Sequence, residues 1–142
     1  MPEPAMTIAE LDRKLTEAFP EVFRAADRVR IEDLRYGACR VRKPFSRNAL
    51  RPGGTISGPT MMELADVTIY IAILGSIGWV PLAVTTHISV NFLRKPAPDD
   101  LIAEGRLLKL GKRLAVGEVA IFSPGSEDMV AHATGTYSIP SG

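Results

Sequence analysis

The sequence predicts an α+β domain in which an antiparallel sheet of about six strands surrounds one long central helix, after a short N-terminal helix. Two observations carry this prediction. An apolar run of helical length, Pro59–Ile77, occupies the middle of the chain, and the segments around it alternate between apolar and polar residues as strands do. Because the run is apolar on nearly every side, it must be enclosed by protein, and a sheet curled around it is the economical arrangement.

Length and composition indicate one ordinary globular domain, residues 1–142. The chain is 46% hydrophobic and 23% charged, and it is long enough to bury a core. A net charge of +1 gives no electrostatic case for nucleic acid or for an anionic membrane surface. One cysteine and two histidines exclude a disulfide framework and disfavour a metal site. The first residues lack a signal-peptide pattern, so we expect a cytoplasmic protein with no membrane partner.

The central helix has recognisable ends. Ser57 or Gly58 can cap its N-terminus, and Pro59 fits the first turn, where a missing N–H costs nothing. The segment Val67–Ile71 alone would suit a strand, and the whole run approaches the length of a membrane span. Its length argues against a strand, and two carboxylates argue against a membrane span. One polar stripe interrupts the apolar surface, formed by Glu63, Asp66 and Tyr70.

The other elements follow from local patterns. Thr7–Phe19 has apolar residues at helical spacing and a capping-box pair, so we expect a short amphipathic helix within the N-terminal segment 1–27. In Leu82–Leu93, strict alternation places Thr85 on the face opposite Ile88 and Val90. Short polar turns join the last three strands, which predicts an antiparallel meander. The expected strands are Val29–Leu34, Ala38–Val41, Leu82–Leu93, Leu101–Leu110, Arg113–Phe122 and Met129–Ile139.

Three stretches carry a family resemblance. They are GGTISG followed by LAD (Gly53–Gly58 and Leu64–Asp66), the segment Ala83–Arg113, and AHATGTYSIP (Ala131–Pro140). In this order and spacing they resemble the PaaI-type (4-hydroxybenzoyl-CoA thioesterase-like) branch of the hotdog acyl-CoA thioesterases. The likeness covers roughly residues 28–139, which would form the hotdog core. It implies a hotdog fold and the hydrolysis of an acyl-CoA thioester to free acid and CoA.

The resemblance also implies roles for single residues. In such enzymes an acid on the central helix acts as a nucleophile or as a base for water, and an amide at the helix start polarises the thioester carbonyl. These positions correspond to Asp66, nine residues after Ser57, and to Gly58. A hydroxyl on the third strand, usually supplied by the partner subunit, corresponds to Thr85. The catalytic set that we expect is Asp66, Gly58, Ser57, Thr85 and Asn48.

Three positions depart from the family pattern. Ser57 stands where the family usually has His, and Pro59 replaces a second Gly. Many members place Asn or Gln six residues before that His, whereas this chain has Arg51 there and Asn48 three residues earlier. The carboxylate and the amide therefore remain, and the polar groups around them differ.

Elementary physical chemistry supports the same two groups. A helix N-terminus presents unpaired N–H groups and the positive end of the dipole, which stabilise an oxyanion. A carboxylate in an apolar helix requires a polar partner. Asp66 could equally be a structural acid paired with an Arg or a strand N–H. Glu63 is a rival catalytic acid, or forms an ion pair with Arg51 or a strand residue.

We expect further substrate contacts from the Gly-rich turn, the polar stripe and two basic turns: Arg51, Gly54, Thr55, Glu63, Arg94, Lys95, Lys112 and Arg113. The resemblance implies that the basic turns meet the CoA phosphates, although such residues are commonly solvated turn charges. It also implies a homodimer or a homotetramer built as a dimer of dimers, with sites at the subunit interface. No cofactor is expected apart from the coenzyme A of the substrate, and no metal.

Two other functions stay open. A non-catalytic acyl-CoA binding or sensing module would explain the missing family His and the Arg51 substitution. A hydratase or dehydratase of acyl thioesters, on CoA or an acyl carrier protein, usually pairs a His with the acid, and neither histidine lies near the motif.

Overall fold

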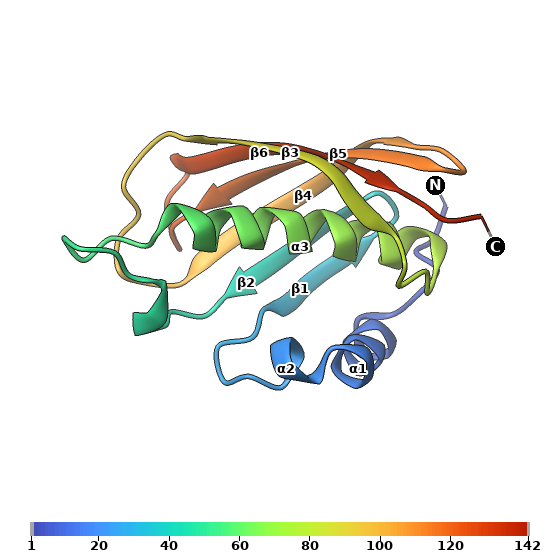
Figure 1. Ribbon diagram of the computed structural model, residues 1–142, viewed down its shortest axis with the longest axis horizontal. Coiled ribbons are helices and arrows are strands. Elements are labelled where there is room, and N and C mark those ends of the chain that lie inside the picture. Colours follow the sequence, from blue (N-terminus) through green and yellow to red (C-terminus); the bar gives the residue numbers. More distant parts are fainter. Residues whose placement is uncertain (1, 142) are drawn as a thin grey trace.

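The computed structural model describes residues 2–141, which form a six-stranded antiparallel sheet around one long helix. Figure 1 shows this helix, α3 (Gly58–Ile77), lying along one face of the sheet. The strands are β1 (Arg30–Arg35), β2 (Ala38–Lys43), β3 (Val84–Phe92), β4 (Leu101–Leu110), β5 (Leu114–Phe122) and β6 (Met129–Ser138). This is the hotdog arrangement, and the fold class predicted from the sequence is confirmed.

Helix α3 is buried because it is apolar on nearly every side. Ile71, Ala72, Ile73 and Leu74 have no exposed surface. By length and composition α3 would pass for a membrane span, with a mean hydropathy of 1.5, but 61% of that stretch is buried by the surrounding protein. Glycines let the sheet approach the helix closely. A Cβ atom on Gly105 of β4 would lie 2.7 Å from Cγ2 of Thr68.

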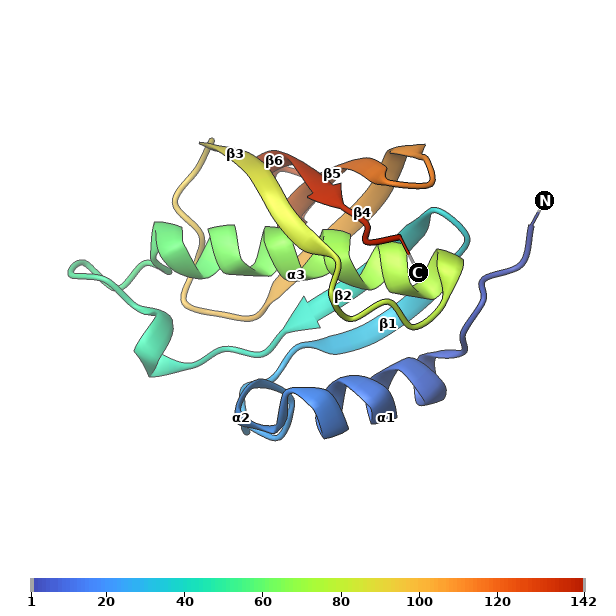
Figure 2. The same ribbon diagram turned by 45° about the vertical axis from the view of Figure 1, so that its right-hand side comes forward.

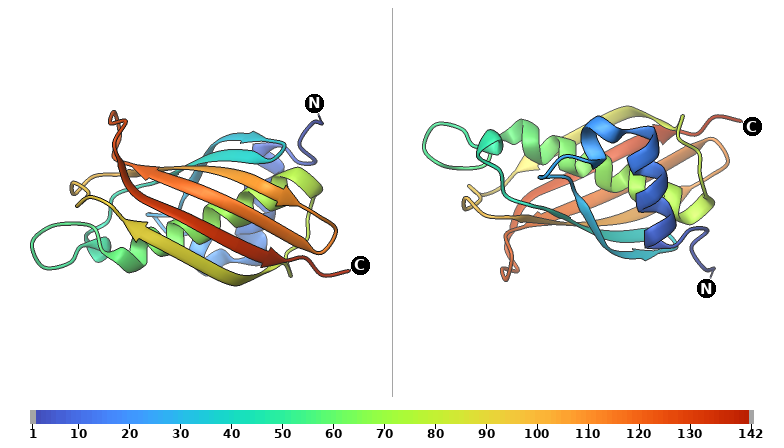
Figure 3. Two further views of the ribbon diagram at one scale, coloured as in Figure 1. Left: turned by 90° about the horizontal axis from the view of Figure 1, so that it is seen from above. Right: turned by 90° about the horizontal axis from the view of Figure 1, so that it is seen from below.

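The spatial order of the strands is β1-β2-β4-β5-β6-β3. The meander predicted for the last three strands is confirmed, since β4 pairs with β5 and β5 with β6. Strand β3 lies at the far edge beside β6, so Arg94–Asp100 carries the chain back across the fold to β4 and is not a hairpin turn (Figure 3, left). The sheet therefore has two edges, β1 and β3.

The N-terminal helix α1 (Ile8–Ala18) is confirmed, including its capping box. The Glu10 N–H donates to Thr7 Oγ1 at 3.1 Å, and Glu10 Oε1 accepts from the Thr7 N–H at 3.3 Å. Leu11 and Leu15 are fully buried. Pro20 starts a further short helix, α2 (Pro20–Phe23), which the sequence analysis did not predict. Figure 2 shows α1 beside β1, near α3.

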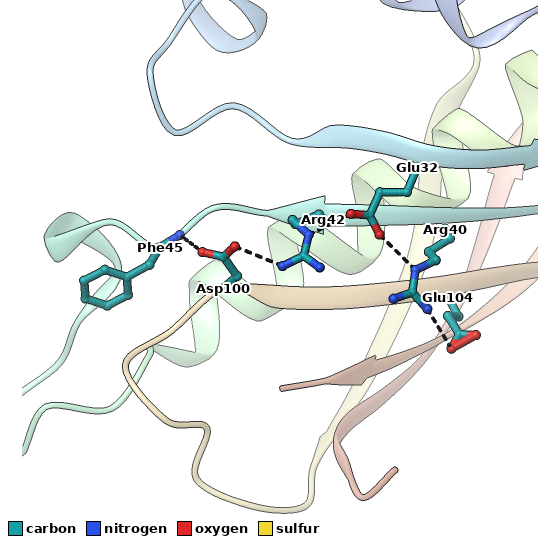
Figure 4. A network of polar contacts seen from close by, with 6 residues as sticks. All are labelled: Glu32, Arg40, Arg42, Phe45, Asp100 and Glu104. Carbon is teal, nitrogen blue, oxygen red and sulfur yellow. Dashed lines mark hydrogen bonds and ion pairs between the residues drawn. The ribbon is translucent and has the colours of Figure 1, made fainter. Parts of the chain in front are cut away.

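A polar network fixes the segment between β2 and α3, which contains a short 3-10 helix, η1 (Arg47–Ala49). Asp100 accepts from the Phe45 N–H at 2.7 Å and from Arg42 Nη1 at 3.0 Å (Figure 4). Glu32 bridges the Nε atoms of Arg40, at 2.9 Å, and Arg42, at 2.7 Å. These contacts hold the approach to the α3 N-terminus against β4.

Candidate active site

The N-terminus of α3 presents a free amide, as the sequence predicts. Ser57 is the N-cap, and its Oγ accepts from the Thr60 N–H at 3.3 Å and lies 2.8 Å from Thr60 Oγ1. The Ser57 N–H donates to the Ala49 carbonyl at 2.7 Å, which ties the helix start to η1. Within residues 2–141, the N–H of Gly58 meets no acceptor. Ser57 therefore holds the helix start, and the Gly58 amide is left for a ligand.

A basic pocket of about 570 Å³ opens beside this amide, between the helix start and the end of β3. A Cβ atom on Gly58 would lie 3.3 Å from the ring of Phe92, so that ring packs against the Cα atom of Gly58. Gly54 lies outside the pocket, in the turn between Arg51 and Thr55, where its φ of 78° favours glycine. Five of the predicted site residues line the pocket: Arg51, Thr55, Gly58, Arg94 and Lys95.

Asp66 lies further along the same helix with two hydroxyl partners. Its Oδ1 accepts from Thr85 Oγ1 at 2.7 Å and from the Tyr137 hydroxyl at 2.6 Å. Within residues 2–141, both hydrogen bonds that this carboxylate receives end on Oδ1, so Oδ2 is free for a ligand or a water. Among residues 2–141, the partners of the Asp66 carboxylate are these two hydroxyls, and neither an Arg nor a strand N–H pairs with it.

Thr85 reaches Asp66 within one chain, so the face that strict alternation gives it is wrong. The cause is a β-bulge in β3 between Thr85 and His87, where one extra residue interrupts the alternation. Thr85 opposes Tyr137 across the β3–β6 ladder, and His87 opposes the next residue, Thr136. The bulge turns Thr85 toward the helix, on the same face as Ile88.

Tyr137 is the site residue that the sequence analysis missed. It is the last residue on the buried face of β6, which otherwise carries small residues such as Ala131 and Ala133, and it is only 4% exposed. Burial raises the pKa of the Tyr137 phenol, and the hydrogen bond to Asp66 raises it further, so Tyr137 is the proton donor in this contact. A lone tyrosine on a buried strand face needs a hydrogen-bond partner, and that signal could have identified it.

Asn48 and Glu63 line a different pocket, of about 310 Å³, between α2 and α3. Its other walls include Val22, Leu64 and Val67. The ion pair considered for Glu63 with Arg51 or a strand residue is absent among residues 2–141. Glu63 is exposed, whereas Asp66 is partly buried and hydrogen-bonded, so the geometry favours Asp66 as the reactive acid.

Lys112 and Arg113 do not join the site within one chain. They form the β4–β5 turn, and the next residue, Leu114, pairs with Ser138, which also pairs with Val84 at the start of β3. The basic pocket lies at the other end of β3, about 26 Å away for a strand of this length. Gly58 and Asp66 are also separated, by about 12 Å along the axis of α3.

Comparison with known proteins identifies a family. Residues 53–130 match the model of the thioesterase superfamily, which is more than half of the chain. A solved structure of a proposed thioesterase from Silicibacter sp. is 44% identical, covers 98% of this chain and 95% of that one, and has a TM-score of 0.88. A proposed esterase from Saccharolobus solfataricus is 25% identical across 96% of this chain and 87% of the relative. A hypothetical thioesterase from Streptococcus pneumoniae shares the fold at 21% identity, with a TM-score of 0.77 over 89% of this chain and 97% of that one.

Proposed function

Because this chain belongs to the thioesterase superfamily, we propose that it hydrolyses an acyl-coenzyme A thioester to the free acid and coenzyme A. The names of its relatives support thioester or ester hydrolysis in general. The observation that carries the proposal is the Asp66 carboxylate, held through Oδ1 by two hydroxyls on the helix whose first amide is free. The Gly53–Gly58 and Leu64–Asp66 motifs favour the PaaI-type branch.

Asp66 acts as a base for water. With Oδ1 engaged by Thr85 and Tyr137, Oδ2 takes a proton from a water molecule while the water oxygen bonds to the thioester carbonyl carbon. The Gly58 N–H stabilises the oxyanion, an effect worth about 3 kcal/mol for one donor in comparable sites. The carbon–sulfur bond then breaks, and coenzyme A leaves as a thiolate that takes up the proton. Water and thioester thus become acid and thiol.

Two copies of the chain build one site. A base and an oxyanion donor must both lie within about 3 Å of one reacting group, and in a single chain they are about 12 Å apart. The free edge of β3 supports a second copy, since Val84 is 55% and Phe92 49% exposed. In an antiparallel β3–β3 pair centred near Ile88, Thr85 of one copy lies opposite Phe92 of the other. Thr85 contacts Asp66 in its own copy, and Phe92 contacts Gly58 in its own copy. Each site then combines the amide of one copy with the acid of the other.

The basic pocket suits the phosphates of coenzyme A. Arg51, Arg94 and Lys95 line it together with Gly58, and guanidinium and ammonium groups are the usual protein ligands of phosphate. The Streptococcus pneumoniae structure contains coenzyme A. In the β3-paired dimer, the β4–β5 turn of the second copy approaches this end of the molecule, so Lys112 and Arg113 contribute from there. Glu63 and Asn48, in the pocket between α2 and α3, lie on the acyl side.

The test is thiol release by the wild-type protein from a panel of short, medium, long and aryl acyl-CoAs. Turnover of at least one member is expected, and the preferred member identifies the acyl class. Thermal stabilisation by the same compounds without any thiol release would instead establish an acyl-CoA binding module. The hydratase alternative gains no support, since His87 is exposed on β3 and His132 lies 3.7 Å from Glu118 Oε2 on the outer face of the sheet.

A further inference from the structure

Two tyrosines stack beneath the Asp66 carboxylate, and their hydroxyls have different partners. The rings of Tyr70 and Tyr137 lie 6.0 Å apart with 25° between their planes. The Tyr137 hydroxyl lies 2.6 Å from Asp66 Oδ1 and 3.1 Å from the Asp66 carbonyl oxygen. The Tyr70 hydroxyl donates to the Pro81 carbonyl at 2.9 Å. One tyrosine therefore binds the acid, and its neighbour binds only the backbone.

The Tyr137 contact is anchored on several sides. Tyr137 is 4% exposed, and its ring is held by the stack with Tyr70 and by its pairing opposite Thr85 in the β3–β6 ladder. The ring of Phe19 packs edge-on against the ring of Tyr70, with 6.4 Å between the ring centroids. A hydroxyl on such a fixed ring has little freedom to turn away, so it holds Oδ1 in one place.

We propose that Tyr137 is a positioning residue for hydrolysis: it fixes Oδ1 of Asp66 together with Thr85 and so directs Oδ2 at the attacking water. This inference rests on the proposed function. The titratable groups around Asp66 are Tyr137 from β6 and, one turn away on α3, Glu63 and Tyr70.

The test compares Tyr137→Phe with Tyr70→Phe on the best acyl-CoA. Tyr137→Phe removes one hydrogen bond to a charged group, so kcat falls about tenfold or more while KM stays within about twofold. Tyr70→Phe loses a part-buried hydrogen bond to the Pro81 carbonyl and keeps the wild-type kcat. Lost thermal stability alone cannot produce this difference, since both variants lose a hydrogen-bonded hydroxyl.

A second substitution covers the case in which Tyr137→Phe does not fold. 3-Fluorotyrosine introduced at position 137 keeps the ring and the hydroxyl but makes a stronger donor to Oδ1, and it changes kcat by more than about twofold with KM unchanged. A wild-type kcat in Tyr137→Phe, or a wild-type kcat with fluorotyrosine, overturns the positioning role, and thiol release by the wild-type protein still leaves the proposed function standing. A wild-type protein that releases no thiol overturns both.

Discussion

The substitution Gly105→Ala tests how closely α3 must approach the sheet. The added Cβ atom would lie 2.7 Å from Thr68 Cγ2, whereas carbon atoms in contact are usually about 3.5–4.0 Å apart. Thr68 is fully buried, and its Oγ1 donates to the Leu64 carbonyl at 2.7 Å. Rotating Thr68 away would break that bond, so the helix and β4 must separate instead. The same separation would draw Asp66 away from Thr85 and Tyr137.

The expected loss is about 2–4 kcal/mol in the free energy of unfolding. Overpacking a filled core costs about 1–3 kcal/mol, and weakening the hydrogen bonds from Thr85 and Tyr137 to Asp66 adds about 1 kcal/mol. Urea unfolding, followed by circular dichroism and by the fluorescence of the single tryptophan, Trp79, measures it. Gly117→Ala on β5 is the matched control. Its closest contacts would be 3.3 Å, so its loss should be clearly smaller.

A rescue variant makes the reasoning refutable. Thr68→Ser removes Cγ2, the atom that the new Cβ meets, and keeps the hydroxyl that bonds to Leu64. The double variant Gly105→Ala/Thr68→Ser should therefore be more stable than Gly105→Ala alone. Additive losses from the two substitutions would show that the close approach is not the cause, and so would a Gly105→Ala protein as stable as the wild type.

Two further predictions concern the shared site and the buried thiol. Gly58→Pro deletes the amide hydrogen at the first position of α3, which the extended ψ of 153° at Ser57 allows once the ring of Phe92 shifts by a few tenths of an ångström. That variant and Asp66→Asn should each be inactive. Refolded together, they should regain about a quarter of wild-type activity, because half of the dimers are mixed and each mixed dimer keeps one intact site. If mixing restores no activity, the Gly58 amide and the Asp66 carboxylate of one site belong to the same chain. Burial raises the pKa of the Cys39 thiol from 9.0 to about 12. The native protein should therefore resist iodoacetamide at mildly alkaline pH and react with it after denaturation. The free energy of unfolding should fall as pH rises from 9.0 toward 12, because only the unfolded protein loses the thiol proton in that range. Rapid alkylation of the native protein would contradict this.

The fold could be predicted from the sequence because its strongest signals are long or local. The apolar run that ends at Ile77 is too long for a strand and too hydrophobic for a surface helix. The Thr7–Glu10 capping box marks the start of α1. The helix α2 was missed because Pro20, which ends α1, also fits the first position of a new helix.

The candidate site was predicted less completely, and the reasons are physical. Gly58 and Asp66 lie on one helix, where spacing alone gives their separation. The partners of Asp66 depend on tertiary contacts. A one-residue bulge in β3 decides which way Thr85 points, and strict alternation places it on the wrong face. Tyr137 on β6 contacts Asp66 on α3 although the two residues are 71 positions apart in the chain, and no local sequence pattern predicts such a contact.

The most direct test of the proposed role of Asp66 compares kcat for Asp66→Asn and Glu63→Gln. The Asn side chain keeps an oxygen that can accept from Thr85 and Tyr137, so the site stays folded and only the base is lost. Asp66→Asn should lower kcat by about a hundredfold or more, the usual size of a general-base contribution, while Glu63→Gln, one turn away, keeps most of it. Retained turnover in Asp66→Asn, or loss of turnover in Glu63→Gln instead, would contradict the assignment of Asp66 as the base.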